Sequence, residues 1–293
     1  MIMQVKSRLM ILAENLGLER LAWSLRRLHC PVSSDALVLD VGSGGNPYPR
    51  ANVLLDAYED TVERYNLPLI KDRPMVFGLA ERMPFRDKAF DFVVASHVLE
   101  HSSDPEAFLS ELMRVSKAGY IETPDGFFER INPFRFHRLE VFDKDNQLTI
   151  IKKPSWKPFP EIVDMYERKV KDADFIRFLS RHPGPFYVRF YWEDKINYTV
   201  LNPETDANWE LPVVADGSYK DQHGKVRLFL LKLVRAFFSQ RSRNRAIDLL
   251  ALLRCPTCAS GRLQQSHEGL RCDSCGADYP QHDQIPILYP KNP

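Results

Sequence analysis

The feature that most constrains the fold is an alternation of short apolar runs with helical stretches between residues 36 and 122. Five runs have the length and composition of buried strands: Ala36–Val41, Asn52–Leu55, Met75–Leu79, Phe90–Ala95 and Gly119–Glu122. A helix is predicted between the last two, because Asp104 can cap it and Pro105 suits its first position. This alternation predicts an α/β fold with a parallel, doubly wound sheet.

The rest of the chain divides into segments of different character. We expect four parts: N-terminal helices over residues 1–35, a sheet domain over 36–215 with an insertion at about 126–185, a basic apolar linker helix over 220–247, and a small separate domain over 248–293. Paired apolar runs predict two hairpins, His137–Phe142 with Leu148–Ile151 and Phe186–Trp192 with Ile196–Leu201. The stretch Glu161–Ser180 predicts a helix between them.

A glycine-rich turn follows the first strand, in the sequence Leu37-Val-Leu-Asp-Val-Gly-Ser-Gly-Gly45. Glycines there let a ligand approach the backbone, because no Cβ blocks it. Asp56 ends the second strand, where a carboxylate can accept hydrogen bonds from both hydroxyls of a ribose. The pattern predicts a nucleoside site. The alternatives are a purely structural turn and an NAD-binding domain, and the second lacks its G-x-G-x-x-G and helix.

The downstream sequence carries a more specific signal. Residues 80–101 read A-E-R-M-P-F-R-D-K-A-F-D-F-V-V-A-S-H-V-L-E-H. They resemble the class I S-adenosylmethionine (SAM)-dependent methyltransferases of the type 11-like group, over about Leu37–Pro124. The resemblance implies a seven-stranded Rossmann-like sheet with SAM over the carboxyl ends of strands one to four. It also implies site residues: Asp40, Gly42 and Gly44 beside the methionine part, Asp56 on the ribose, Ala80 and Glu81 beside the adenine, and Ser96 and His97 beside the transferred methyl group.

Two departures from that family pattern carry predictions of their own. Asp56 follows Asp40 by only 16 positions, against about 20 including a helix in the usual pattern. Asn46-Pro-Tyr-Pro-Arg50 replaces the first turns of that helix, which predicts a loop. Leu79 stands where the family often has an acid, so adenine must be recognised by backbone groups or by another side chain.

Four of the five cysteines form two C-x-x-C pairs near the C-terminus, Cys255 with Cys258 and Cys272 with Cys275. Two such turns can supply four thiolates to one tetrahedral zinc ion, and four protein ligands make that zinc structural. Four unconnected thiols are the alternative. About Asp248–Tyr289 resemble the small zinc-ribbon proteins that act as activating subunits of methyltransferases for tRNA, rRNA and release factors.

The apolar tail of this segment predicts where it packs. Ile285–Tyr289 contains Pro286, which suits an edge strand. The third strand of the predicted sheet, Met75–Leu79, should be an exposed edge. We therefore expect the tail to dock near that strand and to stabilise the sheet domain.

The segment after the fourth strand bears on the methyl acceptor. Methyltransferases that act on amide or adenine nitrogens commonly carry Asn-Pro-Pro-aromatic there, whereas this chain has Ala95-Ser-His-Val, which favours an oxygen acceptor. His97 is the best-placed candidate base, or else a residue that only shapes the pocket. His137, in the insertion where acceptors usually enter, is the second catalytic candidate. His101 is expected to pack locally.

Residues Lys225–Arg245 contain seven basic and no acidic residues among many apolar ones. Three interpretations are open: a buried helix with snorkelling cations, a contact with an anionic membrane, or a site for RNA phosphates. The chain as a whole has 40 basic and 39 acidic residues, a net charge of +1. That balance excludes a nucleic-acid binder of the uniformly basic kind, so any such binding is local.

These observations leave three classes of function. The favoured one is a SAM-dependent methyltransferase, O-directed, acting on a small molecule, a saccharide or a lipid-linked glycan. The alternative is an RNA or protein methyltransferase related to translation, with the zinc ribbon as built-in activator. The third is an inactive binding module, against which Asp40, Gly42 and Asp56 count.

Met1–Gly17 does not read as a signal peptide and no run approaches a membrane span, so we expect a cytoplasmic protein, with peripheral membrane contact as an option.

Overall fold

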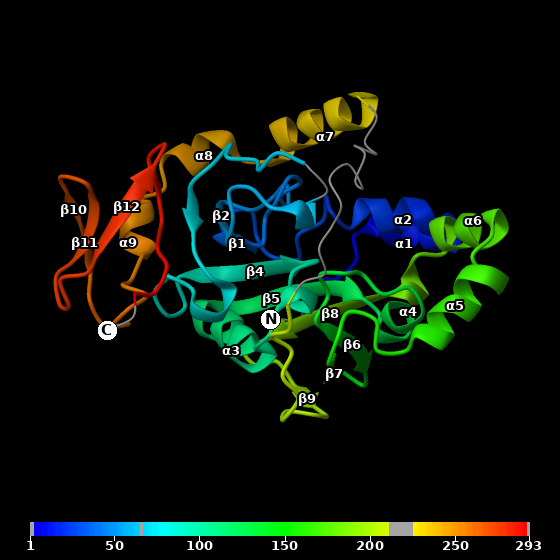
Figure 1. Cartoon of the computed structure of the whole chain (residues 1–293). Coiled ribbons are helices and arrows are strands. Elements are labelled where there is room, and N and C mark those ends of the chain that lie inside the picture. The colour runs from blue at the N-terminus through cyan, green and yellow to red at the C-terminus, as the bar shows by residue number, and fades with distance from the viewer. Residues whose placement is uncertain (1–2, 65–66, 211–224, 292–293) are drawn as a thin grey trace. The chain divides into compact units, whose positions relative to one another are not determined.

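The computed structural model describes residues 3–64, 67–210 and 225–291 (Figure 1). The chain divides into two compact units. The first contains Met1–Ser34, Ala95–Pro105 and Tyr120–Ala215, and the second contains Asp35–Val94, Glu106–Gly119 and Asp216–Pro293. Among the helices of the described residues, none has the length and apolar content to cross a membrane.

The largest sheet has six strands, in the order β3-β2-β1-β4-β5-β8. Their bounds are β1 Val38–Val41, β2 Val53–Asp56, β3 Met75–Phe77, β4 Phe90–Ser96, β5 Ser116–Pro124 and β8 Tyr187–Glu193. β1 runs parallel to β2, and β2 runs parallel to β3. The three strands are buried throughout, which explains why they read as continuous apolar runs. The resemblance implied seven strands, and the part of the chain that the structure describes supplies six.

The connection from β1 to β2 is a loop, as the sequence predicts. Neither Pro47 nor Pro49 lies in a helix, and Pro49 lies in a turn. Arg73 donates from Nη1 to the carbonyls of Pro49 at 3.1 Å and Ala51 at 2.7 Å. The second unit also contains most of α3, Pro105–Val115, whose side chains Phe108, Leu109, Leu112 and Val115 are buried. Short 3₁₀ helices lie at Val62–Arg64 and Ala80–Arg82.

The end of the chain adds helices and a small sheet to the second unit. The helices are α7 Lys225–Phe238, α8 Arg241–Arg245 and α9 Leu249–Leu252. Four antiparallel strands follow in the order β10-β11-β12-β13, with bounds Leu263–Ser266, Gly269–Cys272, Asp278–His282 and Ile285–Pro286. They lie side by side in the orange and red part of Figure 1. We call residues 248–291 the four-cysteine segment.

The four-cysteine segment covers the free edge of β3, which confirms the expectation for the apolar tail. Ile287 forms a parallel bridge with Phe77, and the Leu288 N–H donates to the Phe77 carbonyl at 2.7 Å. A second bridge joins Leu253 to Phe85. Leu253, Leu288 and Phe85 are buried. The edge strand therefore has its backbone groups and its apolar side chains covered by the same chain.

Removing residues 246–293 should destabilise the rest of the second unit. Leu253 and Leu288 would be lost, and each buried leucine contributes about 1.5–3 kcal/mol. The melting temperature should then fall by at least about 6 °C, measured by circular dichroism on the chain ending at Arg245. An unchanged melting temperature, with SAM bound as by the full chain, would refute a stabilising role and favour recruitment of substrate.

The first unit begins with two helices, α1 Arg8–Asn15 and α2 Glu19–Leu25. Gly17 separates them with a φ of +69°, a conformation that favours glycine. Besides β8 and the end of β5, this unit includes α4 Gly126–Ile131, β6 Leu139–Lys144, β7 Gln147–Lys152, α5 Pro160–Lys169, α6 Ala173–Arg181 and β9 Tyr198–Val200.

The insertion differs from the sequence predictions in two places. β6 and β7 form the first predicted hairpin. The prediction of a second hairpin is wrong, because β9 pairs in parallel with β7 and β8 joins the large sheet. The predicted helix over Glu161–Ser180 is two helices, since the Asp172 carboxylate accepts from the Phe175 N–H at 2.8 Å and starts α6 anew.

Candidate functional site

The glycine turn after β1 is tied to the end of β2. Gly42 and Gly44 have φ values of +65° and +55°, which side chains rarely adopt. The N–H groups of Gly42 and Ser43 both donate to the Leu55 carbonyl, at 2.9 and 3.2 Å. These bonds hold the glycine backbone, which has no side chains to block a ligand, next to the end of β2.

Asp56 closes this turn from the β2 side. Its carboxylate accepts from the Gly44 N–H at 2.8 Å and from the Tyr58 N–H at 3.1 Å, and Arg64 Nη1 lies 3.4 Å away. Only 7% of Asp56 is exposed. Burial raises the pKa of Asp56, and these hydrogen bonds with the Arg64 charge offset part of that rise. The carboxylate is held in one orientation and keeps acceptor capacity for a ligand hydroxyl.

The other predicted cofactor residues of the second unit lie on the same three strands or just beyond them. Asp40 is buried near the end of β1, and its Oδ2 accepts from the Tyr48 N–H at 2.6 Å. That bond fixes the loop that replaces the first helix. Ala80 and Glu81 begin the 3₁₀ helix after β3 and are half-buried. The two buried carboxylates are hydrogen-bond acceptors, and the glycine turn beside them lets a ligand approach the backbone.

A buried ion pair organises the first unit near the end of β5. Arg26 donates to Glu122 from Nε at 2.6 Å and from Nη2 at 2.5 Å. Tyr120 donates to the same carboxylate, and Ser96 Oγ lies 3.4 Å from it. Burial opposes the charge on Glu122, but Arg26 and His97 hold its pKa well below the usual range. Glu122 is therefore a fixed negative charge.

His97 lies between two carboxylates. Its Nδ1 is 3.4 Å from Glu100 Oε1 and its Nε2 is 3.3 Å from Glu122 Oε1, while its backbone has a φ of +58°. Desolvation lowers the pKa of His97, but the two carboxylates outweigh it and raise that pKa to about 9. His97 is thus mainly an imidazolium at neutral pH, with 44% of its side chain exposed.

His137, the second catalytic candidate, lies against the same Glu100. Its Nε2 is 3.9 Å from Glu100 Oε1, and its Nδ1 is 2.7 Å from Glu129 Oε2. Lys153 Nζ donates to the other oxygen of Glu129 at 2.8 Å. Burial, with the nearby charges of His101 and Lys153, holds the pKa of His137 well below the usual range. Burial also raises the pKa of Glu129 to about 7, although Lys153 opposes the rise. The structure therefore brings the two predicted histidines to one buried carboxylate.

Sequence reasoning missed most of the charged partners in this cluster. Glu100 belongs to the L-E-H motif, but its burial does not follow from the motif. Arg26 and Glu122 are 96 residues apart, and Glu129 and Lys153 are 24 apart. A buried lysine and glutamate give no local pattern, so only a search for covarying charges could have found them.

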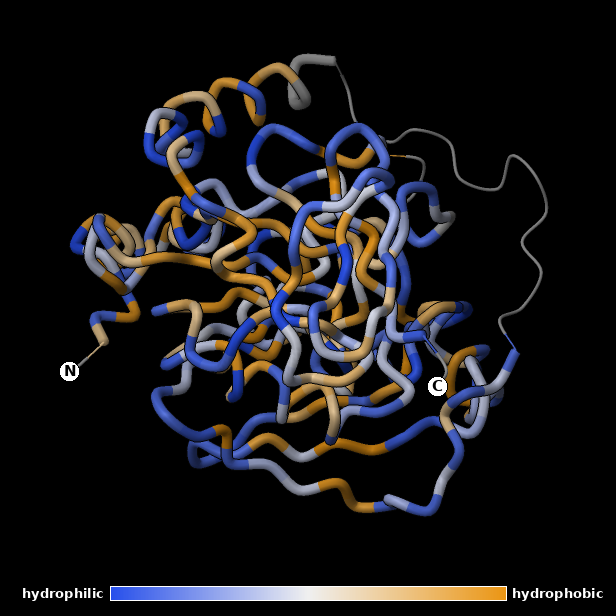
Figure 2. The backbone as a smooth tube through the Cα atoms, turned by 90° about the vertical axis from the view of Figure 1, so that its left-hand side faces the viewer, coloured by the Kyte–Doolittle hydropathy of each residue, from blue (hydrophilic) through white to orange (hydrophobic). Residues whose placement is uncertain are grey.

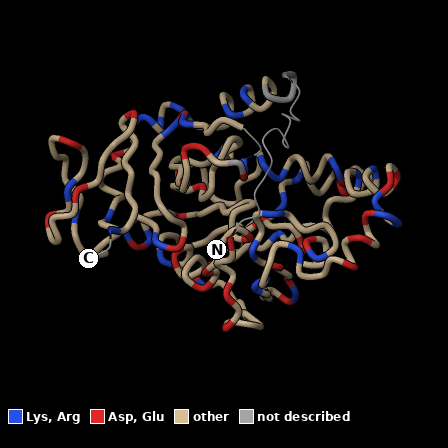
Figure 3. The backbone as a smooth tube through the Cα atoms, in the orientation of Figure 1, with Lys and Arg blue, Asp and Glu red and all other residues tan. Residues whose placement is uncertain are grey.

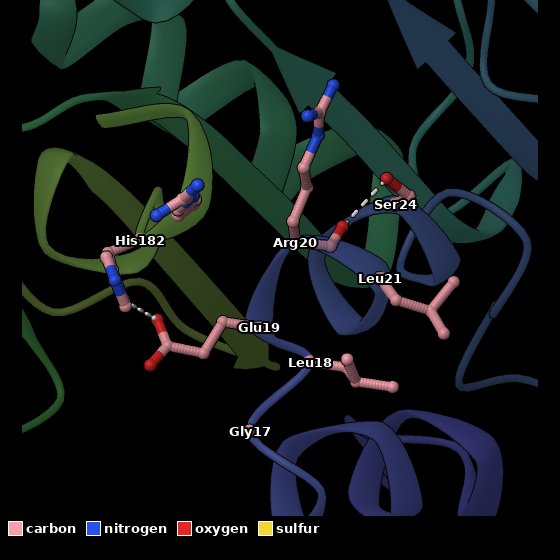
Figure 4. Close-up of a pocket in the computed structure, with 8 residues that line it drawn as sticks. Gly17, Leu18, Glu19, Arg20, Leu21, Ser24 and His182 are labelled. Carbon is pink, nitrogen blue, oxygen red and sulfur yellow. Dashed lines mark hydrogen bonds and ion pairs between the residues drawn. The ribbon is translucent and has the colours of Figure 1, made fainter. Parts of the chain in front are cut away.

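Two cavities lie in the first unit and share Arg20 and Ser24. One has about 510 Å³ and lies between the start of α2 and the end of α6, where Glu19 points at His182 with Oε2 3.0 Å from Nδ1 (Figure 4). The other has about 360 Å³ and is lined mainly by aromatic and aliphatic side chains: Trp23, Phe128, Ile176, Leu179, Pro183, Phe186 and Tyr187. Tyr187 lies edge-on to His97, with ring centroids 5.6 Å apart. The second cavity therefore adjoins the histidine and carboxylate cluster.

The four cysteines of the C-terminal segment converge, with all Sγ atoms within 4.8 Å of one another. The Cys255–Cys275 and Cys258–Cys272 pairs both have an Sγ–Sγ distance of 3.7 Å. A tetrahedron with Zn–S bonds of about 2.3 Å has edges of about 3.8 Å. The Gly261 N–H donates to Cys258 Sγ at 3.3 Å, a contact of the kind that orients metal-binding thiolates. The donor set fits one tetrahedral, thiophilic ion.

Comparison with known proteins assigns part of the chain. Residues 39–121, which carry the glycine turn, Asp56 and His97, match the Methyltransf_11 family, described as a methyltransferase domain. A curated relative, the ubiquinone/menaquinone biosynthesis C-methyltransferase UbiE of Haemophilus ducreyi, is 25% identical over 131 residues, which are 43% of this chain and 49% of that protein. The chain thus spans about half the length of the curated relative it matches.

The solved structures that resemble part of the chain include further methyltransferases. A SAM-dependent methyltransferase from Thermotoga maritima is 20% identical, with a TM-score of 0.28 over 34% of this chain and 50% of that one. A complex of the Trm112 methyltransferase activator of Haloferax volcanii with a partner described as a methyltransferase is 16% identical. Its TM-score is 0.39, over 63% of this chain and 93% of that chain.

Proposed function

We propose that the protein is a SAM-dependent methyltransferase whose methyltransferase domain holds the cofactor through the glycine turn and Asp56. The observation that carries the proposal is the buried Asp56 carboxylate, fixed by the Gly44 and Tyr58 N–H groups at the end of β2. Asp56 would accept from the ribose hydroxyls, since its orientation is already set. Asp40, Gly42 and Gly44 would lie beside the methionine part, and Ala80 and Glu81 beside the adenine.

SAM supplies a methyl group on a positively charged sulfur, and its transfer is a direct displacement by the acceptor atom. The chain's own contribution is to orient that atom and to handle its proton. We propose that Ser96 and His97 orient the acceptor atom, because His97 is mainly protonated at neutral pH, and that His137 receives the proton. Two contacts support these roles. His97 and His137 both lie against Glu100, and His137 contacts Glu129 through Nδ1, which leaves its Nε2 on the side of Glu100.

The cavity beside Tyr187 bears on the class of acceptor. Its lining is aromatic and aliphatic, and Arg20 is the one cationic residue among the lining residues that the structure describes. RNA phosphates would require more cations. The lining favours an acceptor with an apolar part, such as a small molecule or a lipid-linked glycan, while the preference for an oxygen atom rests on Ala95-Ser-His-Val after β4.

Helix α7 supports contact with an anionic membrane surface. Phe229, Leu230, Leu233 and Phe237 are exposed, Phe237 by 85%, so they do not form the buried helix that one interpretation assumed. Hydrophobic residues interrupted by cations run along this helix (Figures 2 and 3). We propose this face as the membrane contact, since exposed aromatic side chains beside cations suit a lipid headgroup region. RNA bound through the same cations is the alternative.

The four-cysteine segment supports the second candidate function. We propose that it binds a structural zinc ion through Cys255, Cys258, Cys272 and Cys275. Its resemblance to activating subunits favours an RNA or protein acceptor in translation, with the segment acting as built-in activator.

Transfer of labelled methyl groups tests both candidates. Full-length protein is incubated with methyl-labelled SAM and lysate of the source cell, fractionated into lipid, small molecule and saccharide, RNA and protein. We expect label in the lipid or saccharide fraction, and none there with the Asp56→Ala variant. Label confined to RNA or protein would favour the second candidate, and label in no fraction would contradict methyl transfer.

A further inference from the structure

A second group of metal-ligating side chains lies in the first unit, far in sequence from the cysteines. Glu100, His101 and His137 each offer one ligand atom, and these three atoms all lie within 4.8 Å of one another. The rings of His101 and His137 meet edge-on, with centroids 4.8 Å apart. One carboxylate oxygen and two imidazole nitrogens thus lie close enough together to bind one ion.

The carboxylate of this group is buried and under-bonded. Glu100 is 1% exposed, and neither of its side-chain oxygens accepts a hydrogen bond within the described part of the chain. His97 Nδ1 at 3.4 Å and His137 Nε2 at 3.9 Å are its ion-pair contacts, both longer than a good hydrogen bond. Buried carboxylates are usually paired or coordinate a metal, because an unsatisfied buried charge is costly. His97 pairs with Oε1, but neither oxygen accepts a hydrogen bond among the described residues, so the carboxylate keeps the capacity to bind a cation.

The geometry of His137 supports the same conclusion. Glu129 Oε2 is 2.7 Å from Nδ1, which fixes the ring and leaves Nε2 on the side of Glu100. Glu129 is held in turn by Lys153 Nζ at 2.8 Å and by the Phe134 N–H at 3.1 Å. Metal-binding histidines almost always have their other nitrogen bonded to a carboxylate, a carbonyl or water in this way.

We propose that Glu100, His101 and His137 bind one divalent first-row transition ion. Two imidazoles and a carboxylate suit manganese, iron or zinc better than magnesium or calcium, which prefer ligands that are all oxygen. Three protein ligands leave coordination positions open to a small ligand with an oxygen donor. This site uses different residues and a different donor set from the four cysteines. It shares His137 with the proposed methyl-transfer site, and an ion bound to His137 Nε2 would take the nitrogen proposed there to handle a proton, so the ion is tested by binding and not by activity.

Binding of manganese to the full chain tests the proposal. Mn²⁺ is the probe because thiolates compete for it poorly and its paramagnetic resonance signal distinguishes free from bound ion. We expect one Mn²⁺ per chain, in addition to any metal held by the cysteines, and a melting temperature that rises with Mn²⁺ concentration.

Three variants locate the ion. Glu100→Gln keeps the shape of the side chain and removes the anionic ligand, so it should abolish Mn²⁺ binding. Glu129→Gln should weaken binding by about 10- to 100-fold, since it changes only the residue that orients His137. His182→Gln is the control, because His182 is also paired with a glutamate, Glu19 at 3.0 Å, but lies outside the cluster. It should bind as the parent does.

The proposal is overturned if the parent binds no Mn²⁺, or if Glu100→Gln binds it as tightly as the parent. SAM binding, measured in parallel, shows whether each variant is folded and reports separately on the proposed function. Should Glu100→Gln fail to fold, the parent's stoichiometry and the Glu129→Gln and His182→Gln affinities still decide the question.

Discussion

Replacing Cys272 with serine is expected to abolish tight zinc binding and to unfold the four-cysteine segment. The four Sγ atoms lie within 4.8 Å of one another, and four small strands cannot build a large core of their own. Binding of structural zinc contributes roughly 10–16 kcal/mol in small domains of this kind, so its loss should exceed the stability of the segment. The backbone also packs closely around Cys272, since a Cβ added to Gly261 would lie 2.1 Å from Cys272 Sγ.

Unfolding of this segment should also expose the edge of β3, because Leu288 and Ile287 cover Phe77. Metal analysis of freshly purified, reduced protein should find one zinc per chain in the parent and none in Cys272→Ser. Binding of an apolar dye should rise in the variant. Cys30→Ser is the control, since Cys30 is outside the group of four, and it should keep its zinc. A parent without zinc, or a Cys272→Ser variant that keeps it, would refute the assignment.

The parts of the fold that sequence reasoning predicted are those that local patterns determine. β1, β2 and β3 are short, fully buried strands, so their apolar runs are continuous and easily found. The loop after β1 follows from Pro47 and Pro49, which cannot sit inside a helix. The cover over β3 follows from an apolar tail that contains Pro286.

The parts that sequence reasoning missed depend on which elements pair. The apolar run at β9 reads as a strand, but nothing in it specifies β7 rather than β8 as partner. That ambiguity produced the wrong second hairpin. The break between α5 and α6 was visible in principle, because Asp172 is an N-cap residue placed before an apolar run.

The candidate site shows the same division. The cysteines, Asp56 and the residues around it belong to local motifs, and the sequence alone singles them out. The surroundings of His97 and His137 come from distant residues, Arg26, Glu129 and Lys153. Their burial and pairing set the charges of both histidines, and a single sequence does not reveal them.

The second large effect is expected at Asp56. If Asp56 holds the ribose of SAM, alanine removes two charge-assisted hydrogen bonds, which together contribute about 2–4 kcal/mol. The dissociation constant for SAM should therefore rise by roughly 30- to 900-fold. Asp56→Asn keeps an acceptor oxygen for the Gly44 N–H and should lose less. Asp60→Ala removes the same charge from an exposed neighbouring position and should bind SAM as the parent does.

Isothermal titration of SAM into the full-length parent and the Asp56→Ala variant tests the central claim most directly. We predict one SAM per parent chain and at least about 30-fold weaker binding by the variant, with a thermal transition that shows the variant to be folded. A parent that binds no SAM would contradict the account, and so would an Asp56→Ala variant that binds SAM within about threefold of the parent.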